Sequence, residues 1–387
     1  GIDGNGVAIE PYVVLEPRGN FTSGLSSGPD AQNKQSVLII YTGGTIGMKK
    51  DTGGALAPVP GYFTEQIFAM SDLSKPEMPM FDCIEYEPLL DSSCFRPTDW
   101  AHIARDIEKN YFKYDGFVVC MGTDTMAYAA SALSFMTEGL GKTIVFTGSQ
   151  IPFSEVYNDA RRNLIFSLIL AAASELPEVC LFFNDRLLRG NRSTKIHSFG
   201  LNAFGSPNCP PLATLGVSIN YRTDLALQPP RTAFRITQDM DSHIVVLKLI
   251  PGFDDEALMV IVRNCTRIKA IVLELYGTGN SPNRRESFLS FIREAKIAGI
   301  MVVALTQCIQ GGVSLSTYAV GAALKEMGVI SGSDMTTEAR DRKKGLAYLF
   351  GRITGPDALQ HIAEAMVTNI RGELSPSQSL VWRSAEP

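Results

Sequence analysis

Two short segments, each directly following a run of apolar residues, constrain this chain more than any other feature. The first reads YTGGTIG (41–47) and follows VLII; the second reads MGTDT (121–125) and follows GFVVC. Such runs are typical of buried strands in a parallel sheet. Ligands of open α/β sheets bind beyond the carboxyl ends of the strands. We therefore expect Thr45 and Thr123, which these segments carry, to converge on one site.

Strand-like and helical stretches alternate along most of the chain. After the second segment we expect a helix at 124–138, a strand at 143–147, a helix at 159–173 and a strand at 179–183. This βαβ order implies a parallel sheet with right-handed crossovers. The alternation stops at Asn184 and resumes near His243. With 387 residues, two domains are expected. The predicted fold class is α/β with two α/β domains, a larger N-terminal one built on a parallel sheet and a smaller C-terminal one.

The predicted boundaries follow from the same pattern. Residues 1–35 form an N-terminal extension, 36–222 the N-terminal domain, 223–242 a linker and 243–387 the C-terminal domain. Within the first domain, Thr98 is expected to cap a helix that ends at Asn110. The glycine-rich loop at 46–60 is expected to be flexible, and the tail after Thr336 is expected to form two helices.

Composition excludes several classes of function. A net charge of −5 argues against a nucleic-acid partner, which would need a basic face. No apolar run approaches the roughly 20 residues of a membrane-spanning helix. The seven cysteines are scattered without CxxC spacing, and the four histidines lack metal-ligand spacing, so neither a disulfide framework nor a metal site is expected. These observations favour a reducing compartment, and we expect the cytoplasm. We also expect no contact with a membrane, no cofactor and no metal.

A nucleophilic threonine needs a neighbouring base, because its hydroxyl is almost fully protonated at neutral pH. No histidine lies near either segment in sequence, but Lys195 follows the strand at 179–183 and could serve. Asp124 could orient Lys195 or bind an ammonium group. The glycines before Thr45 would let backbone N–H groups approach a ligand, as in an oxyanion hole. Taken alone, each feature also fits a tight turn, a helix cap or a surface charge.

Several motifs in the same order resemble those of the bacterial-type L-asparaginases, and most closely their cytoplasmic, type I branch. The resemblance covers residues 36–376. The motifs that carry it are YTGGTIGM (41–48), EPLLDSS (87–93), MGTDTMAY (121–128), GSQIP (148–152), LFFN (181–184), RGNRSTK (189–195), YGTGN (276–280), LTQC (305–308), SDMT (333–336) and RGELSP (371–376).

The resemblance implies the course of the reaction. Thr45 matches the nucleophile that attacks the side-chain amide of asparagine. Thr123, Lys195 and Asp124 match a second cluster, in which the lysine polarises a threonine that activates or positions water. The implied activity is hydrolysis of L-asparagine to L-aspartate and ammonia through an acyl-enzyme intermediate.

The resemblance also implies how the substrate is held. Asp91 and Ser92 match positions that bind the α-ammonium and α-carboxylate groups, a task that Asp124 shares with Thr123. Tyr318 matches a catalytic tyrosine, and Asn280 a substrate contact, that come from a neighbouring subunit. A homodimer or homotetramer with active sites at the intimate dimer interface is therefore expected.

Allosteric activation by a second asparagine is known in type I enzymes, where an arginine grips its carboxylate. This chain has Glu274 at that position, although Thr194 keeps a matching hydroxyl. A carboxylate there repels the ligand, so weak or no cooperativity is expected.

Other functions use the same scaffold. These are a glutaminase, the asparaginase-like subunit of a tRNA-dependent amidotransferase, a lysophospholipase and a non-catalytic asparagine sensor. The acidic balance disfavours the tRNA-dependent enzyme, and retention of Thr45, Thr123, Asp124 and Lys195 disfavours the sensor. Ammonia release from asparagine, glutamine and a lysophospholipid would separate the rest.

Overall fold

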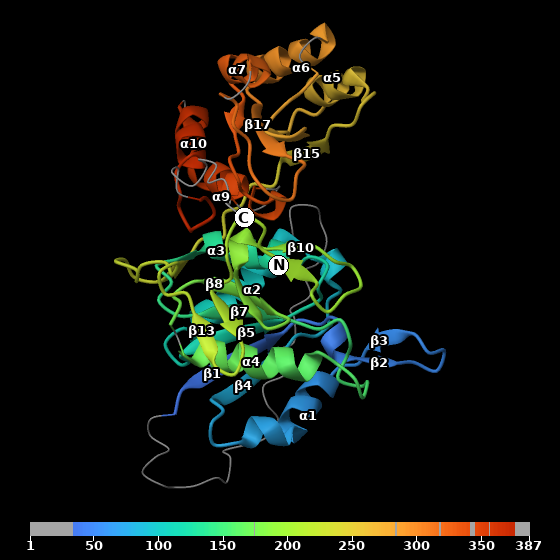
Figure 1. Cartoon of the computed structure of the whole chain (residues 1–387), viewed down its shortest axis with the longest axis vertical. Helices are drawn as coiled ribbons and strands as arrows, with labels where there is room; N and C mark the ends of the chain where they lie inside the picture. The colour runs from blue at the N-terminus through green and yellow to red at the C-terminus, as the bar shows by residue number, and fades with distance from the viewer. Residues whose placement is uncertain are drawn as a thin grey trace, which may run out of the picture.

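The structure is a computed structural model that describes residues 34–173, 175–282, 285–316, 319–340, 345–355 and 357–375. The chain builds two sheets, each covered by helices, with the larger sheet in the N-terminal half (Figure 1). The predicted α/β class is confirmed. The predicted extension at 1–35 lies outside the described residues except for its last two positions, and Tyr318 also lies outside them.

The larger sheet has eight strands in the order β13-β12-β9-β8-β7-β5-β1-β4. Its parallel strands are β1 (Ser36–Tyr41), β4 (Met80–Glu85), β5 (Gly116–Cys120), β7 (Ile144–Thr147) and β8 (Val179–Phe183). At its edge, β9 (Arg186–Arg189), β12 (Ala213–Leu215) and β13 (Ile219–Tyr221) run antiparallel. Tyr41 of β1 is in register with Cys120 of β5, so the two threonine segments begin side by side.

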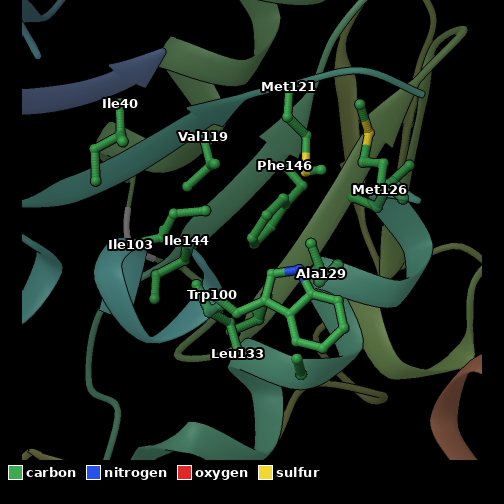
Figure 2. Packing of buried hydrophobic residues seen from close by; sticks show 14 of the residues in the cluster. Ile40, Trp100, Ile103, Val119, Met121, Met126, Ala129, Leu133, Ile144 and Phe146 are labelled. Atoms are coloured by element: carbon green, nitrogen blue, oxygen red, sulfur yellow. The ribbon is translucent and has the colours of Figure 1, made fainter. Parts of the chain in front are cut away.

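Helices cover both faces of this sheet. On one face, α2 (Pro97–Asn110) and α3 (Met126–Met136) pack with residues such as Ile40, Val119 and Phe146, as Figure 2 shows. On the other face, α1 (Tyr62–Ala69) and α4 (Ala160–Ala173) pack against alternate strand residues such as Ile39 and Val118. Every residue of β5 is buried, as expected for a central strand with helices on both sides. The core therefore fixes the strand ends from which the threonine loops emerge.

The start of α2 corrects one expectation. The helix begins at Pro97, and its cap is Arg96 instead of Thr98. The Asp99 carboxylate accepts a hydrogen bond of 2.6 Å from the Arg96 backbone N–H. Proline is favoured at the first helical position because it has no N–H to leave unpaired there.

The smaller sheet is four-stranded and parallel. Its strands are β15 (Ile244–Lys248), β16 (Ala270–Leu275), β17 (Met301–Thr306) and β18 (Ile330–Ser331). The helices of this half are α5 (Asp255–Asn264), α6 (Glu286–Ile297), α7 (Ala319–Glu326), α8 (Thr337–Arg340), α9 (Gly345–Arg352) and α10 (Ala358–Met366). The described part of the tail thus holds three short helices where two were expected.

The segment predicted as a linker is tied to the larger half. Its strand β14 (Arg235–Ile236) pairs with β6 (Thr137–Glu138) at the end of α3. The buried Glu138 carboxylate also accepts hydrogen bonds from Tyr348 (2.7 Å) and Arg352 of α9. This carboxylate therefore joins the two halves.

Four short strands complete the fold. The hairpin β2 (Met48–Lys50) and β3 (Leu56–Pro58) projects from the side of the larger half (Figure 1). The pair β10 (Thr194–Lys195) and β11 (Phe204–Gly205) is antiparallel and lies where the larger half faces the smaller one. Within the described ranges, none of the helices has both the length and the apolar character to cross a bilayer.

Candidate active site

The loops that carry Thr45 and Thr123 touch through their backbones. Gly44 has φ +92°, and a Cβ built on it would lie 2.3 Å from the Gly122 nitrogen. Gly43 has φ +130°, and its Cβ would lie 2.4 Å from the carbonyl oxygen of Leu90. Only glycine combines such φ values with so close an approach. Thr45 is half-buried at this junction.

Lys195 reaches the second threonine from β10. Its ammonium group donates hydrogen bonds to Thr123 Oγ1 (2.8 Å) and to Asp124 Oδ1 (2.7 Å). Thr123 is 7% exposed and the Lys195 side chain 19%, whereas the Asp124 side chain is 67% exposed. The cluster therefore has a sheltered lysine–threonine pair and a carboxylate that remains open to a ligand.

A third loop brings Asp91 and Ser92 to the same edge of the sheet. Leu90 N–H donates a hydrogen bond to the Thr42 carbonyl oxygen (2.7 Å). Ser92 is buried, and a Cβ built on Gly122 would lie 2.6 Å from its hydroxyl oxygen. Asp91 is exposed, and its carboxylate accepts a hydrogen bond from Ser93 N–H (2.9 Å). One carboxylate and one hydroxyl thus stand beside the two threonine loops.

The structure does not bring every predicted site residue together. Asn280 lies in the turn after β16, where its backbone pairs with that of Tyr276. In the described chain, the hydrogen bonds of Asn280 stay within that turn. Tyr318 is outside the described residues, so its expected contribution from a neighbouring subunit stays a prediction.

Gln150 belongs to the site but was absent from the predicted set. Its side-chain oxygen lies 3.4 Å from Thr123 Oγ1, and its amide nitrogen donates to the carbonyl oxygens of Ser198 (3.3 Å) and Gly200 (3.1 Å). Gln150 follows β7, so the rule that sites gather at strand ends could have found it. Thr123 is therefore held from two sides, by Lys195 and by Gln150.

The base of the β2–β3 hairpin is anchored beside Tyr41. The buried Glu85 carboxylate accepts hydrogen bonds from Gly61 N–H (2.5 Å) and from the Thr64 hydroxyl. Burial, followed by the nearby Glu85 charge, raises the pKa of Tyr41 far above its usual value, so this phenol stays neutral. A Cβ on Gly47 would lie 2.1 Å from the Tyr41 hydroxyl oxygen. The backbone that follows Thr45 therefore rests directly on a rigid, buried ring.

The available groups suit acyl transfer. They provide two threonine hydroxyls, a lysine donor and exposed carboxylates, while no cluster of three or more metal-ligating side chains occurs in the described ranges. Such a set can supply a nucleophile and polarise a hydroxyl or a water molecule.

Two family models match the chain. The model described as "Asparaginase, N-terminal" matches residues 36–227, and that described as "Glutaminase/Asparaginase C-terminal domain" matches residues 243–362. Together they cover most of the chain, including all three loops of the site.

Known proteins are similar over nearly the same span. L-asparaginase 1 of Escherichia coli (strain K12) is 46% identical over 346 residues, which cover 89% of this chain and 99% of that protein. The 60 kDa lysophospholipase of Homo sapiens is 35% identical over 365 residues, covering 89% of this chain but 62% of the human protein. The crystal structure of L-asparaginase I from Vibrio cholerae superposes with a TM-score of 0.81 at 42% identity, covering 89% of this chain and 100% of that one.

Proposed function

The chain belongs to the asparaginase family, and on that premise we propose that it hydrolyses L-asparagine to L-aspartate and ammonia through a threonine nucleophile. One observation carries the mechanism: the Thr45 loop packs backbone to backbone against the Thr123 loop, and Lys195 lies 2.8 Å from the Thr123 hydroxyl. The 46% identity to L-asparaginase 1 over nearly its whole length supports the choice of substrate.

In the first step, the Thr45 hydroxyl oxygen attacks the side-chain carbonyl carbon of asparagine. The C–N bond breaks, and the amide nitrogen leaves as ammonia, which takes the proton that Thr45 gives up. The negative charge that develops on the carbonyl oxygen requires donors fixed in advance. Backbone N–H groups of the glycine-rich loop suit this task because no side chain keeps a ligand away from them.

In the second step, water attacks the ester that joins aspartate to Thr45. Lys195 donates to Thr123, which leaves the Thr123 hydroxyl proton free to point at an acceptor such as Gln150 or the incoming water. Fixing that water beside the ester lowers the entropic part of the barrier. Cleavage releases aspartate and returns the proton to Thr45.

The substrate carries a positive and a negative group, and each needs partners in the site. The exposed carboxylates of Asp91 and Asp124 suit the α-ammonium group, and Ser92 together with backbone donors suits the α-carboxylate. Because Asp124 already faces Lys195, an arriving ammonium would share this carboxylate with the lysine.

The test is an ammonia-release assay on purified variants. Thr45→Ala, Thr123→Ala and Lys195→Met should each lose nearly all activity on asparagine while keeping the wild-type melting temperature. Lys195→Met keeps the stem but removes the ammonium, so it separates charge from packing. Full activity of Thr45→Ala would refute the nucleophile assignment. The wild type, assayed side by side on glutamine and a lysophospholipid, would reveal those alternative activities.

The assembly and location are also proposals. We expect a homodimer or homotetramer, because Tyr318 and Asn280 match residues that act from a neighbouring subunit. A fully active monomer in analytical ultracentrifugation would contradict this. All seven cysteines are free, which supports a reducing location such as the cytoplasm.

A further inference from the structure

Lys195 sits on a strand that cannot hold it in place alone. The β10–β11 pair contributes two residues per strand, and a two-stranded ribbon is marginally stable even when longer. The chain that directly precedes this pair can therefore help to fix the position of the Lys195 ammonium. That stretch is the single turn Gly190–Arg192, which is completely buried.

Arg192 is the anchor of this turn. It is 2% exposed and is the largest of the fully buried side chains in the described ranges. Its guanidinium pairs with both oxygens of Asp334, at 2.7 and 3.3 Å. It also donates to Ser375 Oγ (3.0 Å) and to the carbonyl oxygens of Asn208 (2.7 Å) and Glu373. A planar fork of this kind fixes both direction and distance.

Apart from Asn208, the acceptors come from the smaller half and from residues 371–375. Asp334 precedes α8, and Glu373 and Ser375 belong to the RGELSP motif (371–376), which the structure describes as far as Ser375. Ser375 N–H in turn donates to Asp334 (3.1 Å). Burial alone would raise the pKa of Asp334, but hydrogen bonds from Arg192 and Ser375 and the Arg192 charge outweigh burial and lower it. The Asp334 carboxylate is therefore ionised when it faces the arginine.

Residues beside Arg192 make hydrogen bonds to the same two segments of the chain. Asn191 donates from its side chain to the Arg371 carbonyl oxygen (2.8 Å), and Thr194 donates to the buried Glu338 of α8 (2.5 Å). Gly372 has φ +80°, and a Cβ on it would lie 2.9 Å from the Arg189 guanidinium. Residues on both sides of Arg192 are thus held by residues 334–338 and 371–375.

We propose that Arg192 and its acceptors Asp334 and Ser375 position Lys195 for its contact with Thr123. This inference rests on the proposed function, and it adds residues that touch neither substrate nor reacting atoms. A shift of Arg192 moves Lys195, three residues later, relative to Thr123. The effect should therefore appear in kcat and in its pH profile more than in KM.

The experiment compares two buried carboxylates that both join the halves of the molecule. Asp334→Asn replaces one of the two oxygens that accept hydrogen bonds from Arg192 with an NH2 group and removes the negative charge that faces the guanidinium. Glu138→Gln, the control, alters the similar cluster formed with Tyr348 and Arg352, away from Lys195. Both should lower the melting temperature. We expect Asp334→Asn to lower kcat for ammonia release by about 10- to 100-fold and to shift its pH profile, with kcat of Glu138→Gln within about twofold of wild type.

A milder variant keeps the test decisive if Asp334→Asn does not fold. Ser375→Ala removes one hydrogen bond to Arg192 and should lower kcat in the same direction by a smaller factor. Unchanged kcat and pH profile in both Asp334→Asn and Ser375→Ala, with only lower melting temperatures, would overturn the proposal. So would an equal loss of kcat in Glu138→Gln. Absence of ammonia release by the wild type would refute the proposed function instead.

Discussion

Replacing Gly44 with alanine should force the two threonine loops apart. The new methyl group would lie 2.3 Å from the Gly122 nitrogen and 2.6 Å from its Cα. Both are backbone atoms, so no side chain can rotate away. The Gly44 backbone, at φ +92° and ψ 172°, also lies in a region that is essentially restricted to glycine.

The size of the effect follows from this geometry. Ordinary contact begins at 3.4 Å, so the loops must separate by roughly 1 Å. A misplacement of about 1 Å can cost about 100-fold in rate, or about 2.7 kcal/mol of activation free energy. The unfavourable φ adds about 1–3 kcal/mol of strain to the folded state. We therefore expect Gly44→Ala to be a folded but less stable protein with about 1% of wild-type kcat.

Ammonia release and thermal unfolding, measured on the same preparation, test this prediction. Gly252→Ala is the control, because Gly252 has φ +82° but nothing within 4 Å of its added Cβ. It should lose stability and keep its kcat. If Gly44→Ala retains more than half of the wild-type kcat, the close packing of the loops does not set the reaction geometry, and the reasoning fails.

Two further predictions concern regulation and acid stability. Initial rates across a wide range of asparagine concentration should show weak or no cooperativity, because Glu274, which accepts a hydrogen bond from Thr337 (2.9 Å), puts a negative charge at the position that matches the activator-binding arginine of type I enzymes; a clearly sigmoidal curve would contradict this. The lowered pKa of Asp334 stabilises the fold at pH values above its unfolded pKa of about 3.9, and this stability is lost as pH falls through the lower folded pKa. The melting temperature of Asp334→Asn should accordingly fall less than that of wild type between about pH 4 and pH 2, and equal falls would exclude this contribution.

The sequence predicts the central fold well where apolar runs are continuous. The runs before Thr45 and Thr123 are β1 and β5, and the expected strand at 179–183 is β8. These strands are buried on both faces, so their composition is dictated almost entirely by packing. The three edge strands after Asn184 were not predicted, because strands of three or four residues with exposed positions carry little periodic signal.

The site was predictable to the extent that strand ends define it. Thr45, Thr123 and Lys195 all follow strands of the larger sheet, and the structure brings their loops together. Gln150 was missed because a glutamine alone carries no chemical signature. Sequence patterns place Arg192 only within the motif at 189–195, because Asp334 and Ser375, two of its acceptors, lie more than 140 residues away in the sequence. Long-range hydrogen bonds of this kind leave no trace in local patterns.

The buried Arg192 has a consequence for the order in which this chain can become active during synthesis. Thr45, Thr123 and Lys195 are all translated by the time the chain reaches residue 195, whereas Asp334, Glu373 and Ser375 follow much later in the sequence. A nascent chain that has emerged only as far as residue 242 contains the chemical groups but leaves the guanidinium without these acceptors. Burying an unpaired charge is strongly unfavourable. The two regions matched by separate family models are thus interdependent, because residues translated later complete the hydrogen bonds of Arg192.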